Sequence, residues 1–297
     1  MQPPELWGHN CPRRFIIKSR REATRLLFGV LISLLLSPFA NAANADKGEL
    51  VFGVYPYLSP NQIVEQFTPL NDYLAKALGR PVLLRSAPNF AKFIERTSAG
   101  EYDIIFTAPH MGRLAEKRDS YRPLAQTGFP FIVVALARKD SPVKSLDNMR
   151  GRSLAVGAKM SMTYQIMNNA LGKKGLELGK NVKFVDTASF SNIIEAVVRG
   201  EADAGAAPTL LLDNAPAEQR AQLHEIFRAE SVPSFFLLGH PRNGDATLKK
   251  LQAALTDFAG TPAGKTYFAK SLQIDFRPLD AATMKRLDPY TEVFHAP

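Results

Sequence analysis

The chain contains the same order of predicted elements twice, and this duplication restricts its fold more than any other feature of the sequence. Each half is predicted to run strand, helix, strand, helix, strand. The predicted strands are apolar and lie at 50–54, 82–84 and 102–106 in the first half and at 153–157, 182–185 and 204–207 in the second. Short strands that alternate with helices indicate parallel sheets with helices on both faces.

The local signals at the helix ends also repeat. Gly100-Glu101-Tyr102-Asp103 precedes the third strand of the first half, and Gly200-Glu201-Ala202-Asp203 precedes the third strand of the second. Each glycine can take the left-handed conformation that ends a helix, and each acidic pair is expected at a solvated turn before a buried strand. At the helix starts, Ser59 and Ser161 have the small hydroxyl side chain of an N-cap.

Two further apolar segments are interpreted as the places where the chain passes between two lobes. They lie at 131–140 and 232–239, one after each half. Two crossings would form a hinge that lets the lobes close on a ligand. The expected fold is therefore α/β, with two doubly wound sheets joined by a two-segment hinge. Lobe 1 is expected to take residues 46–130 and 236–297, and lobe 2 residues 131–235.

The first 45 residues have the three parts of a secretory signal peptide. A basic region is followed by a short apolar run, Leu26–Leu36, and then by small residues that offer cleavage sites. The apolar run is about half the roughly 20 residues that a membrane-spanning helix needs. We therefore expect residues 1–45 to be removed, with cleavage after Ala42 or Ala45, and the protein to reach the periplasm. An uncleaved anchor is the alternative.

The charge balance weighs against nucleic-acid binding. The whole chain has 37 basic and 28 acidic residues, and the part after residue 45 keeps 31 and 26 of them. This mild excess is not gathered into a dense Lys/Arg run with interleaved aromatic residues, although it can steer an anion. Cys11, the only cysteine, lies in the predicted signal peptide, so the secreted chain is expected to have neither a disulfide nor a thiol nucleophile.

The sequence lacks the motifs of common enzymes and metal sites. It contains no G-x-S-x-G, no H-E-x-x-H and no phosphate-cradling glycine loop, and its histidines lack the spacing of metal ligands. We therefore expect a binding protein that is not an enzyme and that needs no cofactor and no metal.

Several short stretches, in their order and spacing, resemble the type II periplasmic solute-binding proteins. Among these, the chain is most similar to the phosphate/phosphite/phosphonate-type binding proteins of ABC transporters, from Leu50 to about Tyr290. The similar stretches are Phe52–Pro56, Pro69–Leu74, Leu78–Val82, Gly100–Ile104, Arg138–Val143 and Gly151–Ala155. The resemblance implies a monomer that takes a small anionic ligand and docks on an ABC permease in the inner membrane.

The resemblance places the anion at the start of the first helix of lobe 2, on a small-hydroxyl motif that here reads Ser161-Met162-Thr163. Physical chemistry agrees, because free backbone N–H groups and the positive end of the helix dipole favour an oxyanion. Ser161 and Thr163 can add hydroxyl donors, although Ser161 can also be an N-cap alone. Members that bind phosphonates usually carry an acidic residue shortly before this motif, whereas here Lys159 lies nearby.

Further ligand-binding candidates lie in loops that follow strands, because ligands of doubly wound sheets bind outside the carboxyl ends of the strands. These candidates are Tyr55, Tyr57, Thr107, Ala108, His110, Lys159 and Thr209. The hydroxyl groups would donate hydrogen bonds, the lysine would neutralise an anion, and the histidine would bind it when protonated. The plainer alternatives are core packing for the tyrosines, solvation for the lysine, and a surface or helix-cap role for the histidine.

These features together predict a protein that captures a small oxyanion of the phosphonate, phosphite or phosphate class between its lobes. Closure would exclude water and strengthen the hydrogen bonds to the ligand. Two alternatives keep the same fold. One is a sensory binding protein that signals to a membrane histidine kinase, and the other is a binding protein for a different small organic anion.

Overall fold

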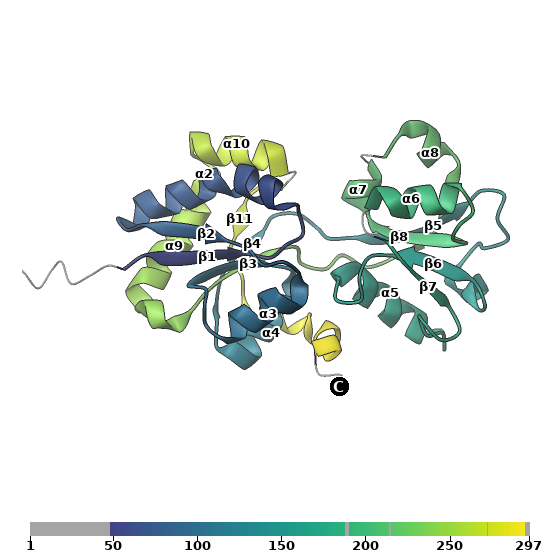
Figure 1. Ribbon diagram of the computed structural model, residues 1–297, viewed down its shortest axis with the longest axis horizontal. Helices are drawn as coiled ribbons and strands as arrows, with labels where there is room; N and C mark the ends of the chain where they lie inside the picture. Colours follow the sequence, from purple (N-terminus) through teal and green to yellow (C-terminus); the bar gives the residue numbers. More distant parts are fainter. Residues whose placement is uncertain (1–47, 188–189, 214, 272, 295–297) are drawn as a thin grey trace, which may run out of the picture. The chain divides into compact units, whose positions relative to one another are not determined.

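The computed structural model describes residues 48–187, 190–213, 215–271 and 273–294, so the signal peptide predicted at 1–45 lies outside the described residues. The described chain forms two β-sheets flanked by helices (Figure 1). Within these residues, no helix is long and apolar enough to span a membrane.

The first sheet has six strands in the order β11-β4-β10-β3-β1-β2. Its parallel part consists of β1 (Leu50–Val54), β2 (Val82–Arg85) and β3 (Ile104–Thr107). Its antiparallel part consists of β10 (Phe236–Gly239), β4 (Arg122–Thr127) and β11 (Phe276–Arg277). The 3₁₀ turn η3 (Pro241–Asn243) follows β10 directly.

Helices cover both faces of the first sheet (Figure 1). One group packs together from distant parts of the chain: α2 (Pro60–Leu78), α9 (Gly244–Phe258) and α10 (Pro262–Ser271). A second group, α3 (Phe90–Ser98) and α4 (Pro109–Asp119), lies on the other side of the strands from α2 and α10. The core between them is rich in aromatic side chains, such as the edge-to-face pair Phe52 and Phe67, whose ring centroids are 6.1 Å apart.

The second sheet has five strands in the order β7-β6-β8-β5-β9. The parallel strands are β6 (Ser153–Val156), β7 (Lys183–Asp186) and β8 (Ala204–Pro208), and β5 (Val133–Arg138) runs antiparallel to β8 and to β9 (Leu223–Arg228). Helices α5 (Met162–Gly172) and α6 (Phe190–Val198) lie on opposite sides of these strands (Figure 1). The short elements are η2 (Leu146–Met149), α7 (Thr209–Asp213) and α8 (Ala217–Ala221).

Both sheets are mixed, whereas the sequence pattern predicted parallel sheets. The parallel part of each sheet comes from the repeated strand-helix-strand series. The antiparallel part contains the strand that enters from the other half of the chain: β5 pairs with β8, and β10 pairs with β3. The prediction therefore holds for the duplicated units and is wrong for the strands that follow each crossing.

The chain passes between the two sheets twice, between β4 and β5 and between β9 and β10. These crossings are shorter than the segments interpreted as hinges, since β5 takes up most of the segment 131–140 and β10 takes up half of the segment 232–239. The two crossings pair with each other through Phe131 and Val232, whose backbone N–H groups donate to each other's carbonyl oxygens at 3.1 and 3.0 Å. This isolated bridge holds the two connecting segments side by side.

The predicted helix ends agree with the structure. Ser59 and Ser161 are the N-cap residues of α2 and α5. Gly100 and Gly200 have φ angles of 68° and 75°, in the left-handed region that favours glycine. The sequence repeated before the third strand of each half therefore reflects the same backbone conformation.

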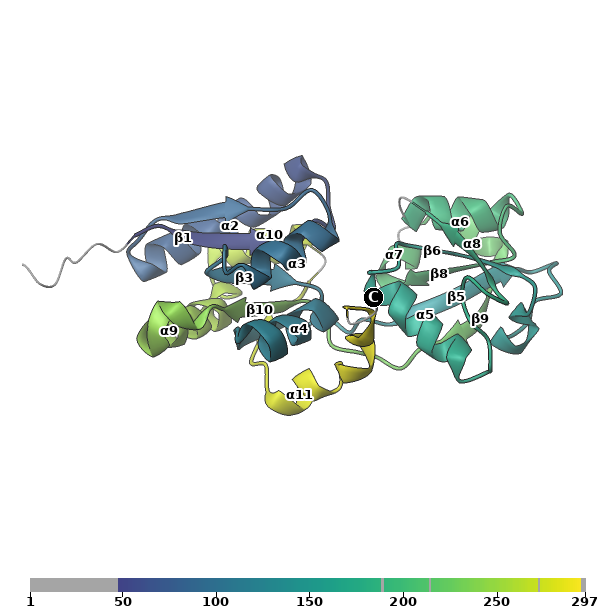
Figure 2. The same ribbon diagram turned by 60° about the horizontal axis from the view of Figure 1, so that its bottom comes forward.

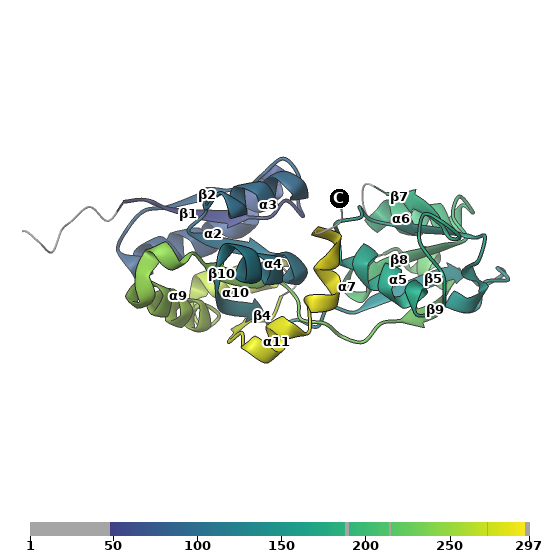
Figure 3. The same cartoon turned by 90° about the horizontal axis from the view of Figure 1, so that it is seen from below.

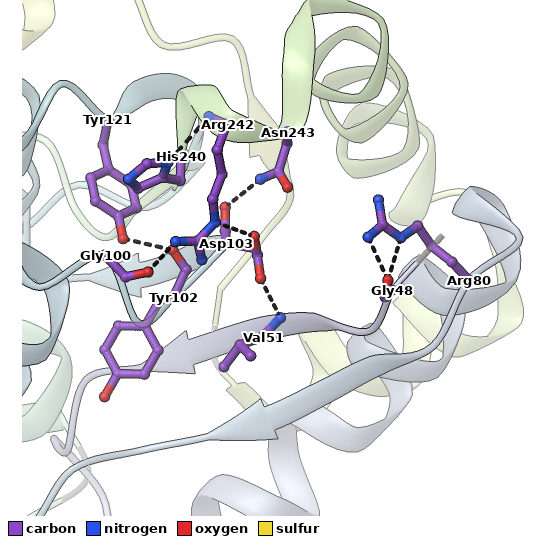
Figure 4. Close-up of polar contacts among 10 residues, drawn as sticks. All are labelled: Gly48, Val51, Arg80, Gly100, Tyr102, Asp103, Tyr121, His240, Arg242 and Asn243. Atoms are coloured by element: carbon purple, nitrogen blue, oxygen red, sulfur yellow. Dashed lines mark hydrogen bonds and ion pairs between the residues drawn. The ribbon is translucent and has the colours of Figure 1, made fainter. Parts of the chain in front are cut away.

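The acidic residue that follows each of these glycines by three positions clamps the neighbouring strand. Asp103 is only 7% exposed. Its Oδ2 accepts the Val51 N–H at 2.8 Å, and its Oδ1 accepts Nε–H of Arg242 at 2.8 Å (Figure 4). Arg242 also donates to the carbonyl of Gly100. The expectation of a solvated acidic residue is wrong for Asp103, because this carboxylate joins β1, β3 and the segment after β10.

Asp203 makes the corresponding clamp in the second sheet. Its Oδ2 accepts the backbone N–H and the hydroxyl of Ser153, each at 2.8 Å, and Arg152 lies 3.3 Å from its Oδ1. Burial opposes ionisation of Asp203, but these hydrogen bonds and the charge of Arg152 outweigh it and lower the pKa of the carboxyl group. The clamp is thus a duplicated structural device.

The C-terminal segment leaves the first sheet and runs past α4 towards α5. It consists of α11 (Ala281–Lys285), η4 (Asp288–Tyr290) and η5 (Glu292–Phe294). Figures 2 and 3 show it beside α4, and η4 contacts both α4 and α5. Asp288 anchors it by accepting Nε–H of Arg113 at 2.7 Å.

Candidate functional site

The start of α5 has backbone N–H groups without acceptors. Ser161 precedes the helix with extended backbone, and its Oγ accepts the Tyr164 N–H at 3.2 Å. Its carbonyl accepts the Gln165 N–H at 3.1 Å. The N–H groups of Met162 and Thr163 have no acceptor among the described residues. Two amide donors at the positive end of an 11-residue helix are suited to an oxyanion.

The local sequence explains why this turn forms. Strand β6 ends at Val156, and five residues later the chain reaches the N-cap serine, Ser161, whose own N–H donates to the Ala158 carbonyl at 2.8 Å. Ser161 is therefore an N-cap, as the plainer alternative held. Its hydroxyl oxygen is an acceptor in this role, so its proton is still available to a ligand. The Met162 and Thr163 side chains are buried, which leaves their amides as the groups of interest.

Tyr55 and Tyr57 follow β1 as a stacked pair. Their ring centroids are 4.8 Å apart with an interplanar angle of 11°. Both rings also pack near Phe106 and Phe235, and the Tyr57 hydroxyl accepts Nε2–H of Gln66 at 2.8 Å. Burial raises the pKa of both phenols, so both are neutral hydrogen-bond donors at physiological pH.

Thr107, Ala108 and Thr209 lie at strand-to-helix turns. Thr107 is fully buried at the end of β3, its Oγ1 has no hydrogen-bond partner, and it borders a cavity of about 10 Å³ between α3 and α4. This space is about the size of one water molecule. Ala108 is the N-cap of α4 and gives it no side-chain cap. Thr209 is half-buried at the start of α7, and its N–H donates to the Ile132 carbonyl at 2.9 Å.

His110 links the first turn of α4 to the loop before α5. Its Nε2 lies 3.0 Å from the Met160 carbonyl oxygen, so this nitrogen is the protonated donor. The ring is fully buried and lies 5.4 Å from that of Phe294. Burial lowers the pKa of His110 to about 4. The imidazole is therefore neutral at pH 7, whereas the sequence pattern predicted that it would bind an anion when protonated.

This buried imidazole predicts a loss of stability on mild acidification. An unfolded chain takes up the proton near pH 6.5, whereas the folded chain does so only near pH 4. The unfolded state binds more protons between these values, so stability falls with falling pH. From pH 7 to pH 5, the loss through His110 is expected to be about 2 kcal/mol.

Urea unfolding at both pH values, for the wild type and for His110→Gln, measures this loss. Glutamine keeps a donor for the Met160 carbonyl but does not titrate, so the difference between the two pH values should shrink by about the same 2 kcal/mol. An equal pH dependence in both proteins would show that His110 is not the buried neutral group described above.

Thr187 is a candidate that the sequence interpretation missed. It directly follows β7, whose last residue, Asp186, pairs with Val156 of β6. Its Oγ1 is buried and has no hydrogen-bond partner. The signal was available, because the loop after the strand predicted at 182–185 also lies at a carboxyl end.

The predicted site residues come from both sheets, and the structure joins them at one contact. His110 contacts the carbonyl of Met160, the residue before the Ser161 cap. Lys159, the residue before Met160, is exposed. The tyrosine pair, Thr107 and Thr209 stay at the ends of their own strands. In the described part of the chain, no three His, Cys, Asp or Glu side chains are grouped to hold a metal ion. The site is chemically a set of neutral and cationic donors.

Two sheets joined by two chain crossings, with free amides at a helix start that follows the carboxyl end of a strand, define the class of two-lobed type II periplasmic binding proteins. A family model described as the periplasmic substrate-binding protein of the phosphonate ABC transporter matches residues 52–284. The chain therefore belongs to this family of extracytoplasmic transport proteins, which bind a substrate for an inner-membrane permease and are not enzymes.

Solved structures share the fold at low sequence identity. A Xanthomonas citri protein bound to a chloride ion is 23% identical, with a TM-score of 0.73 over 82% of this chain and 96% of that one. PhnD1 of Prochlorococcus marinus, in complex with methylphosphonate, is 17% identical, with a TM-score of 0.70 over 83% and 98%. A binding-protein component of a Pseudomonas aeruginosa phosphonate transporter is 19% identical, with a TM-score of 0.69 over 83% and 87%.

Proposed function

We propose that the protein captures a small phosphonate, phosphite or phosphate oxyanion between its two lobes and delivers it to an ABC permease. The observation that carries this proposal is the pair of free amides, Met162 and Thr163, at the start of α5. Amides fixed by a helix need no rearrangement to bind an anion, and the helix dipole adds a favourable field. Ser161, Thr187 and the Tyr55–Tyr57 pair would supply further hydroxyl donors.

Closure of the lobes would complete the site. The paired crossings at Phe131 and Val232 are the segments about which the lobes would move. Bringing the two sets of strand ends together would exclude water and strengthen each hydrogen bond to the ligand. Residues 1–45 would direct the protein to the periplasm as a cleaved signal peptide, and it would act there as a monomer.

Calorimetric titration of the folded protein tests the proposed ligand class. Methylphosphonate, phosphite and phosphate are the candidates, and dimethyl methylphosphonate is the matched control because it has similar shape but no charge. We expect at least one of the three anions to bind with one site per chain and the uncharged ester to show no binding. Binding of none of the anions, or equal binding of the ester, would contradict the proposal.

A further inference from the structure

A polar groove runs along α5, on the side that faces the C-terminal segment. It has a volume of about 610 Å³, and the residues of α5 that line it extend from Tyr164 to Gly172, followed by the C-cap residue Lys173. Its opposite wall is formed by η4 and η5. An ion pair between Arg113 and Asp288, with 2.7 Å between Nε and Oδ1, anchors this segment. A groove of this volume lies in the range of small-molecule sites.

Five charged and amide side chains of this groove are free to bind. Lys159 and Lys173 lie at its two ends, Asn168 and Asn169 lie between them, and Glu292 comes from the opposite wall. Within the described residues, none of these five side chains has a hydrogen-bond or ion-pair partner. Asparagine both donates and accepts, lysine donates and the carboxylate accepts. The groove therefore offers both kinds of partner, which hydroxyl groups need.

One end of the groove lies close in sequence to the helix start that holds the free amides, since Lys159 and Tyr164 line it on either side of Met162 and Thr163. The Gln165 side chain lines the groove and donates through Nε2 to the Lys159 carbonyl at 2.5 Å. Lys159 is two residues before the Ser161 cap. An acidic group bound at the Met162 and Thr163 amides can therefore extend an organic tail from the beginning of α5 along the groove.

We infer that the ligand is a phosphate or phosphonate with a polyhydroxylated tail, which lies in this groove. The inference rests on the proposed function and adds the chemistry of the rest of the ligand. Two lysines and one carboxylate give the groove a net positive charge that suits an anion. A nucleobase fits less well, since the aromatic ring that lines the groove, Tyr164, is 7% exposed and packs against Phe184 with ring centroids 5.2 Å apart.

Two ligands with the same phosphomonoester group isolate the contribution of the tail. The wild type is titrated with methyl phosphate and with sn-glycerol 3-phosphate, and these ligands differ only in the hydroxylated tail that the groove would bind. We expect glycerol 3-phosphate to bind about 10-fold more tightly, because one or two net hydrogen bonds contribute about 1 kcal/mol each. The double variant Asn168→Leu/Asn169→Leu should remove this difference and leave methyl phosphate unchanged. Leucine keeps the side-chain size and favours the helix.

Glu292→Gln provides a second variant, with Glu218→Gln on α8 as its control, because Glu218 is also an exposed carboxylate and lies outside the groove. We expect Glu292→Gln to weaken the binding of glycerol 3-phosphate and Glu218→Gln to leave it unchanged. Equal affinities of the two ligands in the wild type would overturn the groove inference while methylphosphonate binding still supported the proposed function. If the double variant Asn168→Leu/Asn169→Leu lost the same affinity for methyl phosphate as for glycerol 3-phosphate, the groove inference would also be overturned. Failure of the folded protein to bind any phosphate or phosphonate would overturn both.

Discussion

Replacing Met162 by proline is expected to weaken methylphosphonate binding by roughly 10- to 100-fold while α5 stays folded. Proline has no N–H, so the substitution removes one of the two free amides at the start of the helix. A hydrogen bond to a charged group contributes about 1.5–3 kcal/mol, which corresponds to this range of affinity. Proline is favoured at the first position of a helix, and Ser161 already has the extended backbone, with ψ of 149°, that precedes proline.

The matched control is Met162→Ala, which removes the same side chain but keeps the N–H. Met162 is 5% exposed, so both variants lose similar packing and both should lose some stability. Calorimetric titration should give the alanine variant an affinity within a few-fold of the wild type. Circular dichroism verifies that both are folded. Equal affinities for the proline and alanine variants would show that the amide does not bind the ligand.

Replacing Asp103 by alanine is expected to give the largest loss of stability, about 3 kcal/mol. The substitution removes a buried carboxylate and, with it, two charge-assisted hydrogen bonds. Those partners are the Val51 N–H and the guanidinium of Arg242. For a chain of this size the loss corresponds to a melting temperature lower by roughly 6–12 °C. Calorimetric or spectroscopic melting measures it.

Asp203→Ala is the internal comparison for this prediction. Its carboxylate makes the same contact to a neighbouring strand, but its side chain is 33% exposed against 10% for Asp103. Water can therefore replace more of its hydrogen bonds, and the loss should be about half as large. A loss for Asp203→Ala that equals or exceeds that for Asp103→Ala would contradict the account of the two clamps.

Local sequence predicted the duplicated units well because their signals are short-range. Ser161 has a capping side chain at the right distance from β6, and Gly100 and Gly200 are residues that adopt positive φ easily. Each of these features depends on a few neighbouring residues. The helix start proposed for the anion could therefore be located before any tertiary contact was known.

Features that depend on distant residues could not be predicted in the same way. The burial of Asp103 requires Arg242, which lies 139 residues further along the chain. The neutral state of His110 follows from its complete burial, to which the distant ring of Phe294 contributes, and burial outweighs the Met160 hydrogen bond, which raises the pKa. Helix α4 begins at Pro109 after an alanine that gives no capping signal. The groove along α5 exists only because the C-terminal segment returns to it.

The most direct test of the central claim is a crystal structure of the protein with methylphosphonate. We expect a phosphonate oxygen to lie about 2.7–3.2 Å from the backbone nitrogens of both Met162 and Thr163. A phosphonate bound at another place, with these two amides facing solvent or other protein atoms, would contradict the claim.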